Sequence, residues 1–335
     1  MLTLIIIILG VSFLLYTLLG GADFGAGIIE IFANRKEEIT ISKAIAPVWE
    51  ANHVWLILAV VILFTGFPVV YASLSLVLHI PFMLVLIGII LRGCAFTFRH
   101  YDVVNDKSHK YFTVLFRISS FITPFFLGMT LGAMILGRIT LNVQAGFYEV
   151  FISPWLNIFC CTMGLFSISL FAYIASVFLV GETKNDKERI HYSTMAKRFM
   201  LITVLIGLLV FAAAEMEGLG LAKEFMASSA SVAMLLLATL LCPFIWIFLN
   251  RRTHKTLYLR IGAGIQVTAI LVGWFYIQFP VLVQIKDAEP YTFYNTQAPA
   301  ATQQQLLIAL IAGLLLVVPG FVYLFKVFKI KSAET

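Results

Sequence analysis

The chain has 335 residues, of which 61% are hydrophobic and only 12% are charged. A soluble globular domain has about half apolar residues and about a quarter charged ones. The composition therefore excludes a soluble domain and predicts an all-α polytopic membrane protein. The net charge of +6 does not indicate a nucleic-acid partner, because the basic residues lie in the loops of one side.

Nine apolar segments have the length of about 20 residues that a membrane-spanning helix needs. The second and third are joined near Pro68 and Tyr71, which predicts a tight antiparallel hairpin. We expect a single integral-membrane domain over residues 1–335, arranged as two four-helix bundles plus one extra helix. The predicted spans are residues 2–22, 53–72, 74–96, 114–137, 155–180, 199–222, 228–249, 258–280 and 304–327.

The distribution of basic residues between the loops predicts the orientation. Of the 23 Lys and Arg residues, all but Arg138, Lys223 and Lys286 fall on one side of the nine spans. Cytoplasmic loops carry an excess of Lys and Arg, so that side is predicted to be cytoplasmic. The N-terminus is then outside and the C-terminus is cytoplasmic.

The first candidate site residue is Asp23, which follows the first apolar segment in the sequence GGADFGAG. A carboxylate inside or beside a membrane helix costs several kcal/mol, so it is a functional-site hypothesis by default. Gly21 and Gly25 are four residues apart, and small residues at that spacing let helices pack closely in lipid. Asp23 is therefore either a carboxylate that handles protons or a polar neighbour of a packing seam.

The second candidate site lies in PVWEANHVW, at the predicted start of the second span. Glu50 and His53 are three residues apart and share a helix face, so they can relay protons. Trp49 is typical of a membrane interface. Pro47 suits the first turn of a helix, and the helix dipole would favour Glu50 there. Asn52 is the polar residue that this interface role explains least.

Arg92, in LRGCAFTFR, ends the third predicted span. It is either an anchor at the cytoplasmic interface or the ion-pair partner of Asp23 or Glu50, which we expect at the same depth.

Motifs for other chemistry are missing from the sequence. The chain has no P-loop, no dinucleotide-binding glycine fingerprint and no nucleophile elbow. Only His53 and His79 fall well inside predicted spans, and they do not indicate bis-histidine haem ligation. The cysteines lack metal-binding spacing, so we expect core thiols and no metal site; they are Cys94, Cys160, Cys161 and Cys242. The chain alone is not expected to carry out redox chemistry.

The sequence resembles subunit II of the cytochrome bd-type quinol oxidases. The resemblance rests on GADFGAG, PVWEANHVWL, FPVVYA and LRGCAFTFR, all within about residues 14–102, and on the number of spans beyond them. It implies a partner, subunit I, that holds haem b558, haem b595, haem d and the quinol site. The heterodimer would oxidise quinol and reduce dioxygen to water without pumping protons, in the prokaryotic plasma membrane. Small accessory subunits and membrane lipids are further expected partners.

The resemblance also implies roles for individual residues. Asp23 and Glu50 correspond to proton-path carboxylates, and Trp49 and Arg92 match the family motifs as well. The sequence departs from the family pattern at His53, where many members have glutamine, and at Thr97, where many have aspartate. The predicted site is therefore Asp23 and Glu50, supported by Trp49, Asn52, His53 and Arg92.

Two other functions are compatible with the sequence. A self-contained proton-coupled transporter would also place carboxylates in membrane helices, although transporters commonly contain inverted repeats and broken helices near the midplane. A purely structural subunit would use the same carboxylates only in ion pairs and helix caps. The transporter would function alone, whereas the other two functions require a partner.

Overall fold

The computed structural model describes the chain except for residues 102–106, 184, 251–255 and 335. It also leaves aside the side chains of residues 50, 100, 101, 107–109, 143 and 324–334. Within the described residues, nine helices are long and apolar enough to cross a membrane. The predicted all-α fold with nine spans is confirmed.

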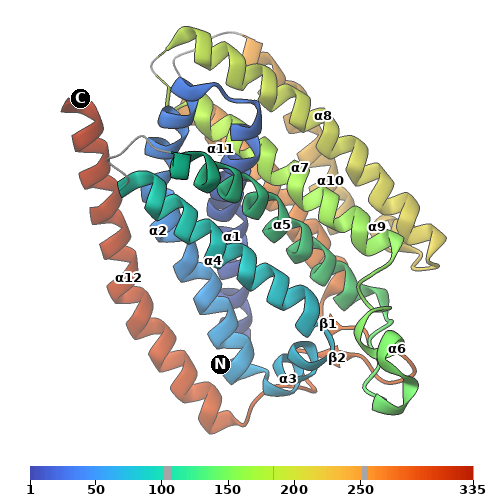
Figure 1. The fold of residues 1–335 in the computed structure, drawn as a ribbon. Helices are drawn as coiled ribbons and strands as arrows, with labels where there is room; N and C mark the ends of the chain where they lie inside the picture. The colour runs from blue at the N-terminus through green and yellow to red at the C-terminus, as the bar shows by residue number, and fades with distance from the viewer. Residues whose placement is uncertain (102–106, 184, 251–255, 335) are drawn as a thin grey trace.

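Short elements connect the long helices, most of them at one end of the molecule (Figure 1). The long helices are α1 (Leu2–Ile29), α2 (Arg35–Gly66), α4 (His79–Tyr101), α5 (Lys107–Leu136), α7 (Ile158–Val180), α8 (Asp186–Met216), α10 (Ser229–Asn250), α11 (Thr256–Gln278) and α12 (Ala300–Glu334). The short elements are η1 (Glu30–Phe32), α3 (Pro68–Val77), η2 (Val143–Ala145), α6 (Phe147–Phe151), α9 (Leu221–Ala227), and the antiparallel strands β1 (Val281–Val283) and β2 (Tyr291–Thr292).

The spanning helices form two groups of four. Helices α1, α2, α4 and α5 make the first group, and α7, α8, α10 and α11 make the second. The groups meet where α7 packs against α1 and α5, and α7 is the most buried of the nine spans. The remaining helix, α12, runs along the outside of the first group and packs mainly on α2 (Figure 1).

Glycines on α1 allow the close contact with α7. A Cβ atom added to Gly25 would lie 1.9 Å from the carbonyl oxygen of Phe171, and one added to Gly21 would lie 2.7 Å from Ile174 Cδ1. Only glycine fits at position 25, where the backbones of α1 and α7 approach each other, whereas Gly21 faces the end of the Ile174 side chain. The packing seam predicted from Gly21 and Gly25 is confirmed.

The second span begins earlier than predicted. Helix α2 starts at Arg35, not at 53, because Asn34 and Glu37 form a reciprocal capping box at its N-terminus. Pro47 therefore lies inside the helix, not in its first turn, and Glu50 is not near a helix start. Hydropathy detects only the part of a helix that is apolar, so a polar extension into water is missed; α8 likewise begins at Asp186, not at 199.

The predicted tight hairpin between the second and third spans is wrong. Helix α2 ends at Gly66, and Pro68 then starts the separate helix α3, which runs to Val77. Proline favours the first turn of a helix, so it begins a new helix after the break at Phe67. His79 is consequently the first residue of α4 and does not lie deep in a span.

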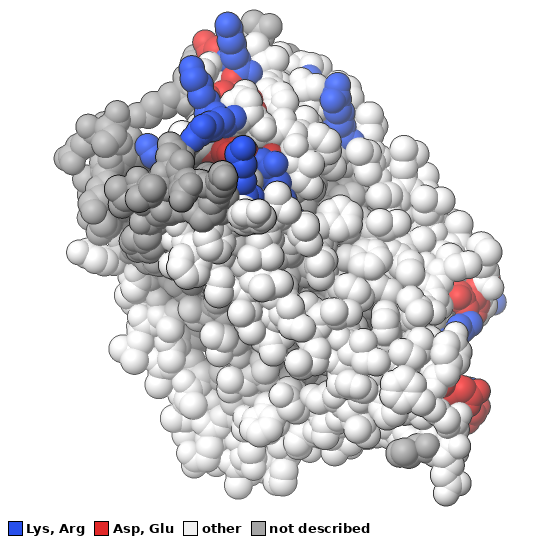
Figure 2. Space-filling model, in the orientation of Figure 1, with Lys and Arg blue, Asp and Glu red and all other residues white. Residues whose placement is uncertain are grey.

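The charged side chains lie at the two ends of the molecule. On the face shown in Figure 2, most Lys and Arg side chains gather at the end where α12 finishes, and few lie at the other end. The wide band between them is almost free of charge. This pattern matches the apolar layer of a bilayer with unequal basic loops.

Substituting Gly25 by alanine should destabilise the protein, because the new methyl group would overlap the Phe171 carbonyl of α7. Overpacking of this kind costs about 1–3 kcal/mol or more. The melting temperature of the purified protein should fall. Gly10→Ala on the same helix is the matched control, since nothing lies within 4 Å of a Cβ at that position. Equal melting temperatures for the two variants would contradict the predicted α1–α7 contact.

Candidate functional site

A buried ion pair joins α1 to α4. Arg92 Nη1 lies 2.5 Å from Asp23 Oδ2, and Arg92 Nη2 donates to the Asp23 carbonyl oxygen at 2.5 Å. The Arg92 and Asp23 side chains are 1% and 0% exposed. The geometry supports Arg92 as the ion-pair partner of Asp23 and not as an anchor at the membrane interface. A buried charge needs such compensation, because leaving one partner alone is strongly destabilising.

Helix α5 and α1 supply the remaining contacts of the Arg92 guanidinium. Its Nε donates to Ser120 Oγ at 2.8 Å. The rings of Phe24 and Phe116 lie 4.6 and 4.7 Å from its central carbon. Aromatic faces attract guanidinium groups, and the attraction grows when water is excluded. The arginine is thus held by an anion, a hydroxyl and two rings from two helices.

Three of the predicted supporting residues lie on α2 beside this pair. Asn52 is fully buried, and its Nδ2 is 3.5 Å from Asp23 Oδ2. Trp49 packs edge-on against His53 with ring centroids 5.6 Å apart. Trp49 also contacts Phe96 of α4 at 5.2 Å. The structure therefore brings Asp23, Arg92 and Asn52 together, with Trp49 and His53 next to them.

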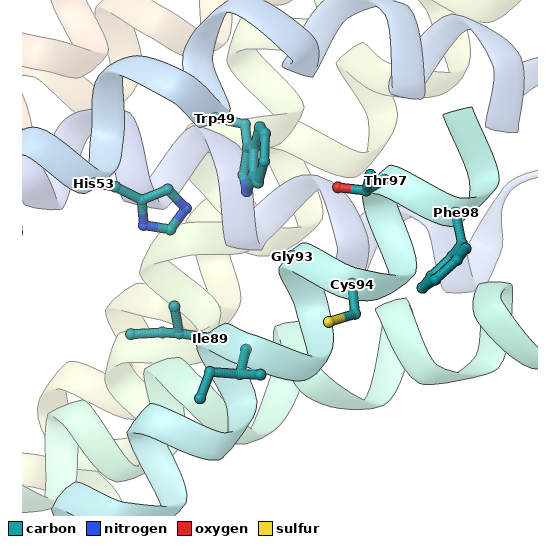
Figure 3. A pocket seen from close by; sticks show the side chains of 8 residues that line it. Trp49, His53, Ile89, Gly93, Cys94, Thr97 and Phe98 are labelled. Carbon is teal, nitrogen blue, oxygen red and sulfur yellow. The ribbon is translucent and has the colours of Figure 1, made fainter. Parts of the chain in front are cut away.

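A hollow of about 470 Å³ opens between α2 and α4 (Figure 3). Trp49 and His53 line it from α2, and Thr97 lines it from α4. Ile89, Ile90, Gly93, Cys94 and Phe98 complete the lining. The two positions at which the sequence departs from the resembled family, His53 and Thr97, therefore line the same hollow.

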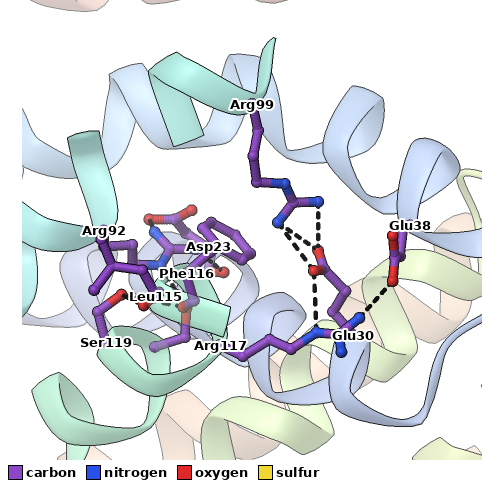
Figure 4. Close-up of polar contacts among 10 residues, drawn as sticks. Asp23, Glu30, Glu38, Arg92, Arg99, Leu115, Phe116, Arg117 and Ser119 are labelled. Atoms are coloured by element: carbon purple, nitrogen blue, oxygen red, sulfur yellow. Dashed lines mark hydrogen bonds and ion pairs between the residues drawn. The ribbon is translucent and has the colours of Figure 1, made fainter. Parts of the chain in front are cut away.

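A second ion cluster lies closer to the basic end of the molecule, and the sequence analysis missed it (Figure 4). Glu30 is fully buried and accepts hydrogen bonds from Arg99 at 2.9 and 3.1 Å and from Arg117 at 3.3 Å. Arg117 also binds Glu38 at 2.5 Å. A spacing signal was present: Glu30 follows Asp23 by seven residues, as Arg99 follows Arg92.

The equal spacing produces two ion pairs stacked along the same two segments. Residues seven apart lie on one face of a helix, two turns apart. Asp23 and Glu30 thus meet Arg92 and Arg99 in register. The long side chains of Arg92 and Arg99 reach from α4 to the C-terminal end of α1. The ring of Phe116 on α5 lies beside both guanidinium groups.

Glu50 lies on α2, but its side chain is outside the described part of the structure. Its backbone is one turn before His53 on the same helix. Its predicted role in a proton path stays a prediction.

His53 and His79, the two histidines that the sequence places inside predicted spans, do not lie next to each other. His79 is the first residue of α4, and its Nδ1 lies 2.8 Å from the Leu76 carbonyl oxygen. His53 faces the hollow lined by residues 89–98 of α4, more than two helical turns from His79. Among the described residues, no group of three or more His, Cys, Asp and Glu side chains is arranged to hold a metal ion.

Residues 1–328 match the family described as cytochrome bd terminal oxidase subunit II. The chain belongs to this family. As a subunit II chain, it is a component of an oxidoreductase complex and an integral membrane protein.

Similar proteins support the same assignment. The chain is 25% identical over 331 residues to a cytochrome bd ubiquinol oxidase subunit 2 of Bacillus subtilis, covering 96% of this chain and 94% of that one. It is 27% identical over 213 residues to a cytochrome bd-I ubiquinol oxidase subunit 2 of Escherichia coli, covering 62% of this chain and 54% of that one. The fold matches a chain of the bd oxidase structure from Geobacillus thermodenitrificans with a TM-score of 0.79, covering 98% of both chains at 21% identity.

Replacing Arg92 by methionine should destabilise this subunit II chain, because the buried Asp23 carboxylate would lose its counter-ion. Breaking a buried pair from one side costs about 3–5 kcal/mol. The double variant Asp23→Leu/Arg92→Met, which leaves neither charge, should recover much of that loss. The measurement is the unfolding temperature of the purified protein. A double variant as unstable as Arg92→Met would show that the ion pair is not what stabilises this site.

Proposed function

We propose that this chain is the subunit II of a quinol:oxygen oxidoreductase and acts only together with a haem-bearing subunit I. Its family and the ubiquinol oxidase names of its relatives support this function. The complex lies in a prokaryotic plasma membrane, with the N-terminus of this chain outside and its C-terminus in the cytoplasm. It oxidises quinol and reduces dioxygen to water. When bound in the partner subunit, haem b558, haem b595 and haem d supply the electron transfer and the oxygen chemistry.

The part of this chain in that reaction is to deliver protons from the cytoplasmic side. Asp23 and Glu50 are the proton-path carboxylates in this proposal. The observation that carries it is the Asp23 site itself: a fully buried carboxylate in a membrane helix, with its charge compensated by Arg92. Asp23 Oδ1 has no hydrogen-bond partner among the described residues, so this oxygen is available to a proton carrier.

The contacts of the supporting residues favour this proposal. Asn52 Nδ2 and Arg92 Nη1 both contact Asp23 Oδ2, at 3.5 and 2.5 Å, and Trp49 and His53, on the same helix as Asn52, line the hollow between α2 and α4. His53 is the imidazole side chain in the lining of that hollow, and an imidazole can accept a proton on one ring nitrogen and donate one from the other. Thr97 has no carboxylate, although many members of the family have an aspartate at this position. In this proposal, His53 and a chain of water molecules carry the proton instead.

A second function has an observation in its favour. The Asp23–Arg92 pair is bonded at two points and shielded from water, as a purely structural ion pair would be. In that case the carboxylate would serve assembly alone. The two functions differ in what the isosteric amide does, because an amide keeps the shape of the site and cannot carry a proton as a carboxylate does.

The partner and the haems are tested by a visible difference spectrum of the complex purified through a tag on this chain. Dithionite-reduced minus air-oxidised spectra should contain haem b bands together with a chlorin band in the red. A colourless and stable single-chain protein would overturn the oxidase function and favour a self-contained transporter.

Glu50→Gln and Asp23→Asn should each slow oxygen reduction by about tenfold or more while leaving the haem content intact, since a lost proton-transfer group costs at least that much. Turnover is measured as oxygen consumption by the purified complex. Glu224→Gln is the matched control, because Glu224 is exposed on α9 at the other end of the molecule. Unchanged turnover removes a residue from the path, and loss of assembly in Asp23→Asn favours the structural role.

A further inference from the structure

A buried polar stripe runs along α1 from Asp23 toward the N-terminus. Ser12, Tyr16, Gly20 and Asp23 follow one another at spacings of four, four and three residues, which places them on one helix face. The side chains of Ser12, Tyr16 and Asp23 are all buried. By helix rise, the stripe covers about 16 Å, half of the hydrocarbon layer.

Asn52 of α2 fills the gap in this stripe. A Cβ atom added to Gly20 would lie 3.0 Å from Asn52 Oδ1 and 3.2 Å from Asn52 Nδ2, so the amide rests directly on the glycine. Asn52 Nδ2 also points to Asp23 at 3.5 Å. The amide therefore continues the polar stripe between Tyr16 and Asp23.

Three buried oxygen atoms of this stripe lack a hydrogen-bond partner among the described residues. They are the Tyr16 hydroxyl, Asn52 Oδ1 and Asp23 Oδ1. Each belongs to a side chain at most 5% exposed. Buried polar groups left unsatisfied cost about 1–3 kcal/mol each, so three along one stripe indicate a common ligand.

The chemistry of the three atoms fits water. Two are acceptors, the carboxylate and amide oxygens, and one is a hydroxyl that both donates and accepts. Buried water typically makes about three hydrogen bonds to such groups. A metal cation is disfavoured, because the Arg92 guanidinium already neutralises Asp23 at this position.

We propose that Tyr16, Asn52 and Asp23 bind buried water, and that this water with the Tyr16 hydroxyl continues the proton route from Asp23 toward the middle of the membrane. The inference rests on the proposed function. Each water oxygen and the Tyr16 hydroxyl oxygen along this route accepts one proton and releases another, and Asn52 Oδ1 only accepts a hydrogen bond that orients the water, so no group changes its net charge after a transfer. Ser12, one turn beyond Tyr16, is the next polar side chain along the route.

Tyr16→Phe removes only the hydroxyl and tests this route. We expect the variant complex to contain its full haem complement and to consume oxygen more slowly by about threefold or more, because a positioned proton-transfer group is lost. The ratio of rates in H₂O and D₂O should rise, since proton delivery becomes slower relative to the other steps. A merely structural tyrosine would not change this ratio.

Tyr173→Phe is the matched control. Tyr173 is another deeply buried tyrosine of a spanning helix, and its hydroxyl donates to Gln266 of α11 at 2.7 Å. Its loss should leave the oxygen rate and the isotope ratio unchanged. A Tyr16→Phe complex with wild-type values for both overturns the inference. If Glu50→Gln and Asp23→Asn nevertheless consume oxygen slowly, only the inference fails. If all three variants consume oxygen at the wild-type rate, the proposed proton-delivery function fails as well.

The wild-type complex gives a test that does not depend on a variant folding. A high-resolution structure of the heterodimer should contain density for water within about 3 Å of the Tyr16 hydroxyl and Asn52 Oδ1. A map that resolves other buried waters and is empty at this position would overturn the inference.

Discussion

The burial of the Asp23 carboxylate in the membrane is the constraint on which the first half of this structure depends. An ionised group in that position is stable only with a counter-charge and further hydrogen bonds. Arg92 supplies the charge, and its guanidinium must in turn be held by Ser120 and by the rings of Phe24 and Phe116. The pair therefore determines how α1, α4 and α5 are placed around it.

The glycines and the ion pair of α1 lie on different faces of the same stretch of helix. Gly25 brings α1 against α7 on one face, while Asp23 and Glu30 point to the arginines on another. Tight packing on the α7 side excludes lipid and water from the helix, and this exclusion strengthens the electrostatic attraction on the other side. A polar site and a packing seam are thus two properties of the same stretch of residues.

The same ion pair gives a physical reason for a proton role. One carboxylate oxygen, Oδ2, is contacted by both Arg92 and Asn52, and the other, Oδ1, has no hydrogen-bond partner among the described residues. A carboxylate with both oxygens bonded would serve only as an anchor. The hollow between α2 and α4 adds two further polar side chains, His53 and Thr97, to this part of the molecule.

The sequence by itself determined the nine spans and the close packing at Gly25, and it marked Asp23, Asn52 and Arg92 as polar residues that need partners in a membrane, because hydropathy, small-residue spacing and the cost of a membrane charge are local properties. Tertiary structure decided the rest. Arg92 selects Asp23 only because α1 and α4 are brought into register, and Glu30 becomes buried only because Arg99 and Arg117 reach it from other helices. The break at Phe67 and the start of α2 at Arg35 depend on capping and proline geometry, which hydropathy does not detect. Contacts between residues 69 positions apart in sequence are set by helix packing, so no local pattern could assign them.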